Sequence, residues 1–487
     1  MEDYTGKKIL ILGLARSGMA AVKLLCRLGA AVTVTESKPP EQIKEKDELE
    51  ALGVRLSGQT PEIFEEDFDL AVKNPGINGN LWFVRRLRER GIPVITEIEL
   101  AYRAAAPQFY IAVTGTNGKT TTVTLLHRLF REYGCHAGLL STIVNKVDDE
   151  AIPSTHTTPD ALELNSLLSR MVQAGCQYAF IEVSSHSIVQ NRIAGLTFAG
   201  GIFSNITHDH LDYHKTMAAY IAAKKAFFDQ LPSTAFALTN IDDRNGNVMV
   251  QNTRAHVHTY SLQRMADYRC RVMEESFQGT LLEINGCPVS TRLVGRFNAY
   301  NLTAIYAAAV LCGMPHGDAL RLLSTLEAAE GRFQYVSGKG ITAIVDYAHT
   351  PDALQNVLSA INGMRRQGQT LITVVGCGGD RDTTKRPEMA RIAADLSDRL
   401  ILTSDNPRTE DPGRILDDME AGLTLEDKSR AVRIPDRRQA IRTAVLMAHE
   451  GDIILVAGKG HEKYQDIQGV KHHFDDKEEL ENILIKD

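Results

Sequence analysis

Short apolar runs of strand length alternate along the chain with segments whose apolar residues recur at helical spacing. In the N-terminal part the runs are KKILILG, AAVTVTES and FDLAVKNPG, and the helical patterns are MAAVKLLCRLGA and EQIKEKDELEALG. This alternation is typical of repeated β-α-β units, which form parallel sheets covered by helices. The pattern therefore predicts a Rossmann-like domain at residues 1–107.

Two further series of apolar runs follow. The first comprises QFYIAVTG, CQYAFIEVSSH, AGGIFSNITH and TAFALTNIDD, then a β-rich stretch at residues 257–294 and a helix expected after GRFN. The second comprises GITAIVDYAHTP, QTLITVVGCGG, DRLILTSDNPR and GDIILVAGKGHE. We therefore expect an α/β protein of three domains, with a central parallel-sheet domain at 108–332 and a C-terminal Rossmann-like domain at 333–487.

Composition agrees with a multidomain globular enzyme. The chain has 487 residues, more than one hydrophobic core usually holds, and 43% of them are hydrophobic and 24% charged. The net charge is −7 without a block of lysine and arginine, which argues against nucleic-acid binding. The sequence has no membrane-spanning stretch and no export signal, so we expect a cytoplasmic protein.

The cysteines also agree with a cytoplasmic protein. The seven cysteines are scattered and form no C-x-x-C pair. This argues against a disulfide framework and against a zinc ribbon. Buried free thiols are the expected state.

The strongest chemical signal is TGTNGKTTT at residues 114–122, after the apolar run FYIAV. Glycines in a strand-to-helix turn let backbone N–H groups face phosphate oxygens, and the helix offers its positive N-terminal end. Lys119 would reach the terminal phosphates, and the Thr120 hydroxyl could ligate Mg²⁺. The spacing is compressed, because Val113 stands where the usual pattern has its first glycine. The context favours a P-loop ATPase-type central domain over a turn without chemical meaning.

This compressed loop resembles that of the Mur ligases of peptidoglycan synthesis and of their folylpolyglutamate synthetase relatives. The motifs HTTPDALELN, IEVSSHSIVQNR, FSNITHDHLDYH, AAYIAAKKAFF, GRFNAYN, EGRFQ, VDYAHTPDAL, GDRDTTKRPEM, SDNPRTEDP and AGKGHE follow in the order of the branch that adds the third stem-peptide residue. The resemblance runs from about residue 108 to the end. It implies a monomeric, ATP- and Mg²⁺-dependent amide ligase of cell-wall synthesis, which serves cell shape and division. Its implied reaction adds meso-diaminopimelate to UDP-N-acetylmuramoyl-L-alanyl-D-glutamate through an acyl phosphate.

The resemblance also implies residues for the ATP half of the site. Phosphoryl transfer to a carboxylate brings two anions together, so metal ions and a lysine are needed. Thr120, Glu182 and His210 are the implied metal ligands, and Lys224 is implied to be carbamylated, although an exposed helical lysine would otherwise be a solvated charge. The implied catalytic residues are Lys119, Lys224 and His210. The implied ATP contacts are Gly115, Thr116, Asn117, Gly118, Lys119, Thr120, Thr121, Asn298, Asn301, Arg332, Asp346 and His349.

Two alternatives concern this half of the site. His208, His210 and His214 could together hold zinc, but neighbouring carboxylates and the lack of a nearby cysteine favour Mg²⁺. Asn298 and Asn301 stand three apart on one helix face, where carboxamides could read the adenine edge. Asn298 could equally cap the helix.

Two substrate pockets are implied as well. Arg408 in DNPR would bind the distal carboxylate of diaminopimelate, which lysine lacks, and such a bidentate pair is strongly selective. The implied contacts of the incoming amino acid are Arg381, Asp405, Asn406, Arg408, Gly458 and Glu462. The implied contacts of the sugar, lactoyl and peptide portions of the UDP substrate are Thr157, Thr158, Ser184, Gln190 and Arg192.

The N-terminal domain departs from this branch. ILGLARSGMAA, TVTES, KNPGI and PVITEIELAYR instead resemble the member of the family that adds D-glutamate. By that resemblance the first glycine turn and its neighbours hold the uridine and its phosphates. The implied residues are Ala15, Arg16, Ser17, Glu36, Ser37, Asn74 and Gly76.

Other functions stay open at this point. D-glutamate addition to UDP-N-acetylmuramoyl-L-alanine and the same third step with L-lysine are alternatives within the family. A nicotinamide dehydrogenase is disfavoured, because Ala15 replaces the second glycine of G-x-G-x-x-G. A noncatalytic UDP-sugar sensor is disfavoured too, because it would not need Lys119, Glu182 and His210.

Overall fold

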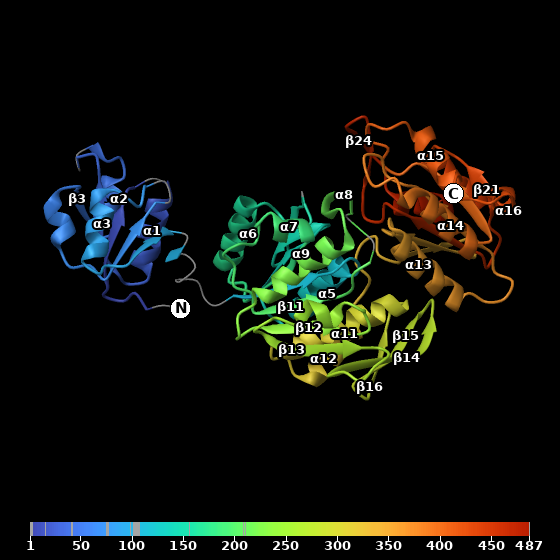
Figure 1. The fold of residues 1–487 in the computed structure, drawn as a ribbon, viewed down its shortest axis with the longest axis horizontal. Coiled ribbons are helices and arrows are strands. Elements are labelled where there is room, and N and C mark those ends of the chain that lie inside the picture. The colour runs from blue at the N-terminus through green and yellow to red at the C-terminus, as the bar shows by residue number, and fades with distance from the viewer. Residues whose placement is uncertain are drawn as a thin grey trace. The chain divides into compact units, whose positions relative to one another are not determined.

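The chain folds into two compact units, Met1–Gln108 and Phe109–Asp487. The structure is a computed structural model that describes residues 3–14, 16–39, 42–74, 77–97, 99–100, 108–154, 156–207, 209 and 211–486, with only the backbone described at 16, 17, 211 and 212. Figure 1 shows the fold. The predicted division of the second unit at residue 332 stays a prediction.

The first unit is an open parallel sheet with the strand order β3-β2-β1-β4-β5. Apolar side chains form a core on each face of the sheet. The order reverses at β1, and ligands of such sheets bind beyond the carboxyl ends of the strands at that point. The elements are β1 (Lys8–Leu12), α1 (Arg16–Arg27), β2 (Ala31–Glu36), α2 (Lys46–Ala51), β3 (Arg55–Gly58), the 3-10 helix Pro61–Glu65, β4 (Leu70–Lys73), α3 (Trp82–Glu89) and β5 (Val94–Thr96).

The predicted Rossmann-like arrangement is confirmed. The helix expected from EQIKEKDELEALG begins only at Lys46. The Lys46 amide instead donates to the Ile43 carbonyl at 3.3 Å in a turn, and Ile43 packs into the core. Local turn bonds and the burial of one apolar side chain therefore shorten this helix.

The second unit contains an eleven-stranded sheet with the order β16-β15-β14-β13-β12-β11-β6-β10-β7-β8-β9. Its central strands are parallel, and short antiparallel segments extend both ends. The strands are β6 (Phe109–Thr114), β7 (Ala137–Leu140), β8 (Val144–Val147), β9 (Glu150–Pro153), β10 (Tyr178–Glu182), β11 (Gly200–Phe203), β12 (Phe236–Asn240), β13 (His256–Ser261), β14 (Tyr268–Ser276), β15 (Gly279–Ile284) and β16 (Cys287–Thr291). The β-rich stretch predicted at 257–294 is confirmed.

Helices cover both faces of this sheet. One core contains side chains of α5 (Lys119–Glu132), α11 (Arg296–Leu311) and α12 (His316–Leu323). The other contains side chains of α6 (Ala161–Gln173), α7 (Ser185–Val189), α9 (Met217–Asp229) and α10 (Gly246–Val250). The short α8 (Leu211–His214) precedes α9. The helix expected after GRFN begins inside that motif, at Arg296.

A six-stranded sheet with the order β17-β18-β22-β19-β20-β21 follows, with only the edge strand β17 antiparallel. Helices α13 and α14 pack on one face, and α17 and α18 on the other. This matches the C-terminal Rossmann-like domain that the sequence predicts. The elements are β17 (Gln334–Gly338), β18 (Ile341–Asp346), α13 (Pro351–Met364), β19 (Leu371–Val375), α14 (Lys385–Leu396), β20 (Arg399–Leu402), α15 (Pro412–Glu420), α16 (Leu425–Ser429), β21 (Ala431–Arg433), α17 (Arg437–Met447), β22 (Ile453–Ala457), β23 (Tyr464–Ile467), β24 (Val470–His473), α18 (Asp476–Glu481) and the terminal π-helix Asn482–Lys486.

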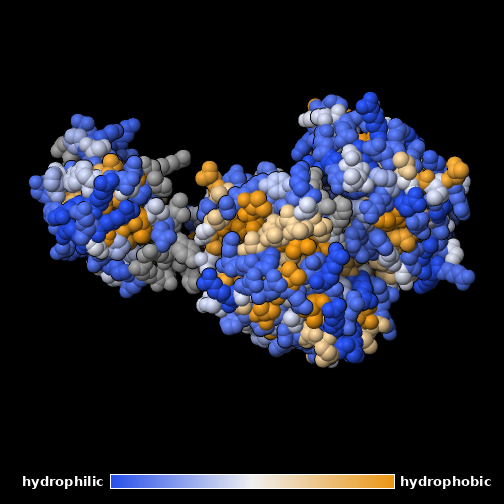
Figure 2. All heavy atoms as spheres, viewed as in Figure 1, coloured by the Kyte–Doolittle hydropathy of each residue, from blue (hydrophilic) through white to orange (hydrophobic). Residues whose placement is uncertain are grey.

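The face seen in Figure 2 mixes hydrophilic residues with smaller apolar areas. Within the described part of the chain, no helix has the length and apolar character to cross a bilayer. All seven cysteines are free thiols, as predicted, but the prediction that they are buried holds only for Cys176, Cys270 and Cys377, and Cys287 is exposed.

Candidate active site

The phosphate loop between β6 and α5 is held in place by tight contacts at its two glycines. Gly118 has a φ of 83°, and a Cβ there would lie 2.4 Å from the Asn301 Oδ1. At Gly115 a Cβ would lie 2.0 Å from the Ser204 Oγ. The Asn117 amide donates to the Asn205 Oδ1 at 2.9 Å. The compressed loop therefore needs glycine where it meets α11 and the segment after β11.

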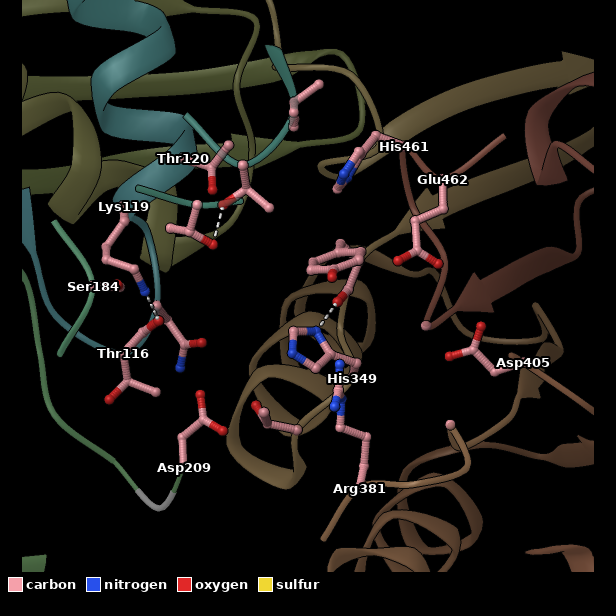
Figure 3. A pocket seen from close by; sticks show the side chains of 18 of the residues that line it. Thr116, Lys119, Thr120, Ser184, Asp209, His349, Arg381, Asp405, His461 and Glu462 are labelled. Atoms are coloured by element: carbon pink, nitrogen blue, oxygen red, sulfur yellow. Dashed lines mark hydrogen bonds between the residues drawn. The ribbon is translucent and has the colours of Figure 1, made fainter. Parts of the chain in front are cut away.

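Lys119 folds back over this loop. Its Nζ donates to the carbonyls of Gly115 at 3.0 Å and Thr116 at 2.7 Å (Figure 3). Loss of hydration lowers the pKa of Lys119, against the attraction of the Glu182 and Asp209 carboxylates. The ammonium group thus lies beside backbone oxygens from which it could move to a phosphate.

Oxygen atoms that could ligate a hard cation lie close together at the start of α5. Glu182 is 2% exposed at the end of β10, so it is not a surface carboxylate. It accepts from the Thr120 Oγ1 at 3.0 Å, and from the Thr142 amide and hydroxyl at 3.0 Å each. Arg332 donates to the Thr120 Oγ1 at 3.3 Å.

This donor set fits Mg²⁺, which proteins often bind through one or two carboxylates and substrate phosphates. Among the described residues, no group of three or more His, Cys, Asp or Glu side chains is placed to hold a metal by itself. His210 and His208 lie outside the described residues, so the predicted ligand role of His210 stays a prediction. His214 is buried and bonds through its Nε2 with the Ser185 Oγ at 2.9 Å.

Lys224 and Lys225 are adjacent on α9, but their side chains have different partners. Lys224 is 1% exposed, and its Nζ donates to the Gly115 carbonyl at 2.7 Å. Burial and the nearby charge of Lys119 place the pKa of Lys224 well below its ordinary value. Lys225 instead pairs with Asp229 at 2.7 Å. The alternative that Lys224 is a solvated charge is therefore wrong.

The segment around β18 contributes three predicted residues. The Arg332 guanidinium lies 4.7 Å from the centroid of the Tyr347 ring. Asp346 accepts from the Phe333 amide at 2.8 Å, and burial raises its pKa to about 6. Burial lowers the pKa of His349 to about 4, which keeps its ring neutral.

A further contact ties the phosphate loop to α13. The Asn117 Nδ2 donates to the Asp352 Oδ2 at 2.7 Å, which links the loop after β6 to α13. Asp352 was not among the predicted site residues, although it lies within the motif VDYAHTPDAL.

The two asparagines of α11 are buried together. Gly295 is the N-cap of α11, so the interpretation of Asn298 as the helix cap is wrong. Asn298 donates to the Val294 carbonyl at 2.8 Å, and Asn301 donates to the Asn298 Oδ1 at 3.2 Å. Their carboxamides order the N-terminal turn of the helix that meets Gly118.

The residues predicted for the peptide part of the UDP substrate form one cluster beside Glu182. Thr158 donates to the Glu182 carbonyl at 2.7 Å and accepts from the Ser184 amide at 3.2 Å. Arg192 donates to the Thr158 carbonyl at 2.8 Å and to the Gln190 Oε1 at 2.6 Å. The hydroxyl of Thr157 bonds with that of Thr142 at 3.1 Å.

The predicted amino-acid pocket is assembled from loops after β19, β20 and β22. Asn406 donates to the Glu462 Oε2 at 2.7 Å, and Arg408 donates to the Gly379 carbonyl at 2.5 Å. Arg408 has a φ of 52°, an unusual backbone for a non-glycine residue, fixed by hydrogen bonds of its amide and carbonyl to Asp466 and Gln468. Burial and the Asp405 charge raise the pKa of Glu462.

A cavity of about 920 Å³ joins these parts. Figure 3 shows phosphate-loop side chains on one side of it and Arg381, Asp405 and Glu462 on the other. The predicted residues that line the cavity are Thr116, Asn117, Gly118, Lys119, Thr120, Thr121, Thr157, Glu182, Ser184, Lys224, Arg332, His349, Arg381, Asp405, Asn406, Arg408, Gly458 and Glu462. The predicted residues Gly115, Thr158, Gln190, Arg192, Asn298, Asn301 and Asp346 are not part of this lining.

Sequence reasoning missed several lining residues. They include Thr142, His156, Asp209, Tyr347, Lys385 and His461. The first follows β7, and Tyr347 follows β18, at strand ends that parallel sheets bring to one edge. That rule was the available signal for both residues.

The first unit places some predicted residues at its own strand ends. Glu36 accepts from the Leu14 amide at 2.9 Å and from the Ser37 amide at 2.8 Å. Partial burial opposes ionisation, but these bonds outweigh it and lower the pKa of Glu36. Asn74 donates to the Glu97 Oε1 at 3.4 Å. Ala15 and Gly76 lie outside the described residues, as do the side chains of Arg16 and Ser17.

Comparison with known proteins gives the family. The family model of the Mur ligase middle domain matches residues 113–309, and that of the Mur ligase glutamate ligase domain matches residues 331–460. Both ranges lie in the second unit.

Two curated relatives carry the same name, UDP-N-acetylmuramoyl-L-alanyl-D-glutamate–2,6-diaminopimelate ligase. The protein of Phocaeicola vulgatus is 58% identical over 378 residues, 77% of this chain and 78% of the relative. That of Lactiplantibacillus plantarum is 41% identical over 412 residues, 81% of this chain and 82% of the relative.

Solved structures agree. A structure with the same ligase name is 32% identical, with a TM-score of 0.57, over 98% of this chain and 92% of that one. The UDP-N-acetylmuramate-alanine ligase of Thermotoga maritima, 18% identical with a TM-score of 0.54 over 93% of this chain and 95% of that one, shares the fold. The chain belongs to the Mur ligase family.

Proposed function

We propose that this chain joins meso-diaminopimelate to the D-glutamate of UDP-N-acetylmuramoyl-L-alanyl-D-glutamate, with conversion of ATP to ADP and phosphate. The observation that carries the proposal is a cavity in which a lysine-bearing phosphate loop faces a pocket with two arginines and two carboxylates. Relatives with that name at 41% and 58% identity support the same assignment.

The first step forms an acyl phosphate. A γ-carboxylate oxygen of the D-glutamate bonds to the γ-phosphorus of ATP, and the bond to the bridging oxygen breaks with its electron pair leaving on ADP. Lys119 moves from the Gly115 and Thr116 carbonyls to the transferring phosphoryl group and offsets its charge. Asn298 and Asn301 hold the helix turn beside the loop, on the side proposed for adenine.

Metal ions belong to this step. Thr120, Glu182 and His210 are the residues proposed to hold Mg²⁺, which when bound neutralises the phosphate charge. Lys224 is proposed to be carbamylated, since a lysine must be uncharged to react with CO₂, and its burial favours the uncharged form. The carbamate would place a negative charge beside the metal site.

The second step makes the amide bond. The amine nitrogen of diaminopimelate attacks the acyl carbon, the tetrahedral intermediate expels phosphate, and the nitrogen loses its proton. Asp405 and Glu462 are suited to the second ammonium group, and Arg381 and Arg408 to the distal carboxylate. L-lysine lacks that carboxylate, which would leave an arginine unpaired and favours diaminopimelate over L-lysine.

The UDP portion is assigned to the first unit. Glu36, Ser37 and Asn74 lie at or just after the carboxyl ends of β2 and β4, on either side of β1, where nucleotides bind to such sheets. Seven free cysteines favour the reducing cytoplasm as the compartment.

D-glutamate addition remains a second candidate. It is favoured by one observation: both matched family ranges lie in the second unit, and the first unit carries motifs that resemble the D-glutamate-adding ligase. The amino-acid pocket favours diaminopimelate, because Asp405 and Glu462 offer a partner for a second ammonium group, which D-glutamate lacks.

A panel of substrates tests the proposal. Purified protein with ATP and Mg²⁺ receives UDP-muramoyl dipeptide or monopeptide, together with diaminopimelate, L-lysine or D-glutamate. Phosphate release should occur with the dipeptide and diaminopimelate. Release with monopeptide and D-glutamate instead would establish the second candidate.

Two variants accompany this panel. Lys119→Ala should abolish phosphate release while its circular dichroism matches wild type. Arg408→Ala should lower kcat/KM for diaminopimelate about 10²-fold, the cost of a lost charge-assisted bidentate pair, while the KM for ATP is unchanged. An unaltered preference of Arg408→Ala for diaminopimelate over L-lysine would contradict the role of this arginine.

A further inference from the structure

Two buried cations lie behind the acidic side of the amino-acid pocket. Arg437 is 1% exposed and Lys459 is 0% exposed. Neither lines the cavity, whereas Asp405, Asn406 and Glu462 beside them do. Figure 3 shows Asp405 and Glu462 on the same side of the cavity.

Arg437, at the start of α17, holds two pocket loops at once. Its Nε and Nη2 donate to the two carboxylate oxygens of Asp476 at 2.7 Å each, a bidentate pair with α18. The same guanidinium donates to the carbonyls of Ala457 at 3.0 Å and Ser404 at 3.4 Å. One planar group therefore spans the ends of β22 and β20.

These two carbonyls belong to the residues directly before pocket residues. Ser404 precedes Asp405, and Ala457 precedes Gly458. The loops are in contact, since a Cβ at Gly458 would lie 3.5 Å from the Asp405 Oδ2. The separation of the loops therefore fixes where the Asp405 carboxylate points.

Lys459 holds the other acidic side chain. Its Nζ donates to the Asn406 Oδ1 at 2.9 Å and lies 3.4 Å from the Glu462 Oε2 and 3.5 Å from the Asp405 Oδ1. Two carboxylates offset by one ammonium leave one net negative charge, which suits a single substrate ammonium group.

The carboxylates of Asp405 and Glu462 attract both buried cations, Arg437 and Lys459. Burial opposes the charge of Arg437, but Asp476, Asp405 and Glu462 outweigh it and raise the pKa of Arg437. A buried ion pair is weak evidence for stability, because desolvation cancels much of its attraction. The pair of Arg437 with Asp476 therefore calls for another role.

We propose that Arg437, fixed by Asp476 and supported by Lys459, is a positioning residue that sets the geometry with which Asp405 and Glu462 receive the ammonium group of the amino-acid substrate. This inference rests on the proposed function. It predicts that a substitution of Arg437 raises the KM for the amino-acid substrate and leaves the KM for ATP unchanged.

The test compares three full-length variants in the phosphate-release assay. Arg437→Lys keeps the charge but cannot hold the carboxylate and both carbonyls together. Its KM for diaminopimelate should rise about 10- to 100-fold, the range found when residues that orient metal ligands are changed, with the KM for ATP unchanged. Asp476→Asn keeps the shape of the partner and should give a smaller rise in the same KM.

Arg430→Lys is the matched control. Arg430 also joins a carboxylate, Asp427 at 2.7 Å, and a carbonyl, Ser397 at 2.7 Å, but lies away from the cavity lining. This control should lower the melting temperature at most. If Arg437→Lys changes only the melting temperature, or raises both KM values together, the positioning role is overturned.

The outcomes separate the two proposals. If Arg437→Lys does not fold, the same criteria apply to Asp476→Asn. If wild type uses another amine of the panel, the proposal of diaminopimelate as the substrate is wrong. The positioning role is then decided with that amine, by whether Arg437→Lys raises its KM and leaves the KM for ATP unchanged. A wild type that uses no amine overturns both.

Discussion

Burial gives neighbouring lysines of α9 different chemistry. Lys224 and Lys225 are adjacent in the sequence, but one is 1% exposed beside the phosphate loop and the other pairs with Asp229. An uncharged amine can react with CO₂, whereas a paired ammonium cannot. The environment, and not the residue type, thus selects the proposed carbamylation site.

Carbamylation can be tested directly. With ¹³C-labelled bicarbonate, wild type and Lys225→Arg should show a carbamate carbonyl signal by NMR, and Lys224→Arg should not, because its guanidinium stays charged. Removal of CO₂ from the buffer should lower the activity of wild type. A signal that survives in Lys224→Arg would refute the assignment.

Asp346 predicts a pH dependence of stability. Burial raises its folded pKa from 3.8 to about 6, so the folded state binds this proton more tightly than the unfolded state. Its contribution is fully present below about pH 4 and is lost as the pH rises through about 6. The loss amounts to about 3 kcal/mol, at about 1.4 kcal/mol per pKa unit.

Denaturant unfolding of wild type and Asp346→Asn checks this prediction. The free energy of unfolding of the variant, relative to wild type, should rise by about 2.4 kcal/mol, most of the total, between about pH 4 and pH 7. A difference that is constant over this range would show that Asp346 does not titrate differently in the folded protein.

The phosphate loop and α11 depend on each other through Gly118. Two glycines border α5, and both have left-handed backbones: Gly118 with a φ of 83° and Gly134 with a φ of 97°. A Cβ at Gly118 would meet Asn301 at 2.4 Å, whereas a Cβ at Gly134 would meet nothing within 4 Å. A comparison of alanine variants at the two positions therefore distinguishes the effect of backbone strain, which both share, from that of the steric contact at Gly118.

Alanine variants at these glycines should behave differently. Each should lose about 1–2 kcal/mol of stability from left-handed strain. Gly118→Ala should in addition weaken ATP binding measured by calorimetry, because the loop must shift away from Asn301. Equal ATP affinity in Gly118→Ala and Gly134→Ala would contradict the tight contact.

The two compact units contain separate cores, and a natural probe distinguishes them. The chain has one tryptophan, Trp82, which lies on α3 of the first unit and packs 5.2 Å from Phe64. Its fluorescence reports the first unit alone. Circular dichroism reports both units together.

Ligands should stabilise the units selectively. UDP at about 100 times its Kd should stabilise the fold that binds it by about 2.7 kcal/mol. The midpoint of the tryptophan-detected melt should therefore rise with UDP and not with ATP, while ATP with Mg²⁺ raises a transition seen by circular dichroism. If UDP does not change the midpoint of the tryptophan-detected melt, the first unit does not bind UDP.

Local sequence patterns were sufficient for much of this protein. Many of the strands and the phosphate loop could be predicted, because apolar periodicity and glycine spacing are properties of contiguous residues. Ordered motifs also indicated the family and the two halves of the site. The hydrogen-bonded turn that delays α2 and the true N-cap of α11 could not be predicted, because packing and backbone geometry decide them.

Tertiary structure alone decided which of these residues act together. Thr120 and Glu182 are far apart in the sequence, and strand order brings them within 3.0 Å. The burial of Lys224, and the contact of Arg437 with both pocket loops, likewise depend on elements that meet only when the sheets are assembled. The physical reason is that a sequence pattern specifies which face of an element is apolar, whereas the loss of water around a charge depends on everything packed against it.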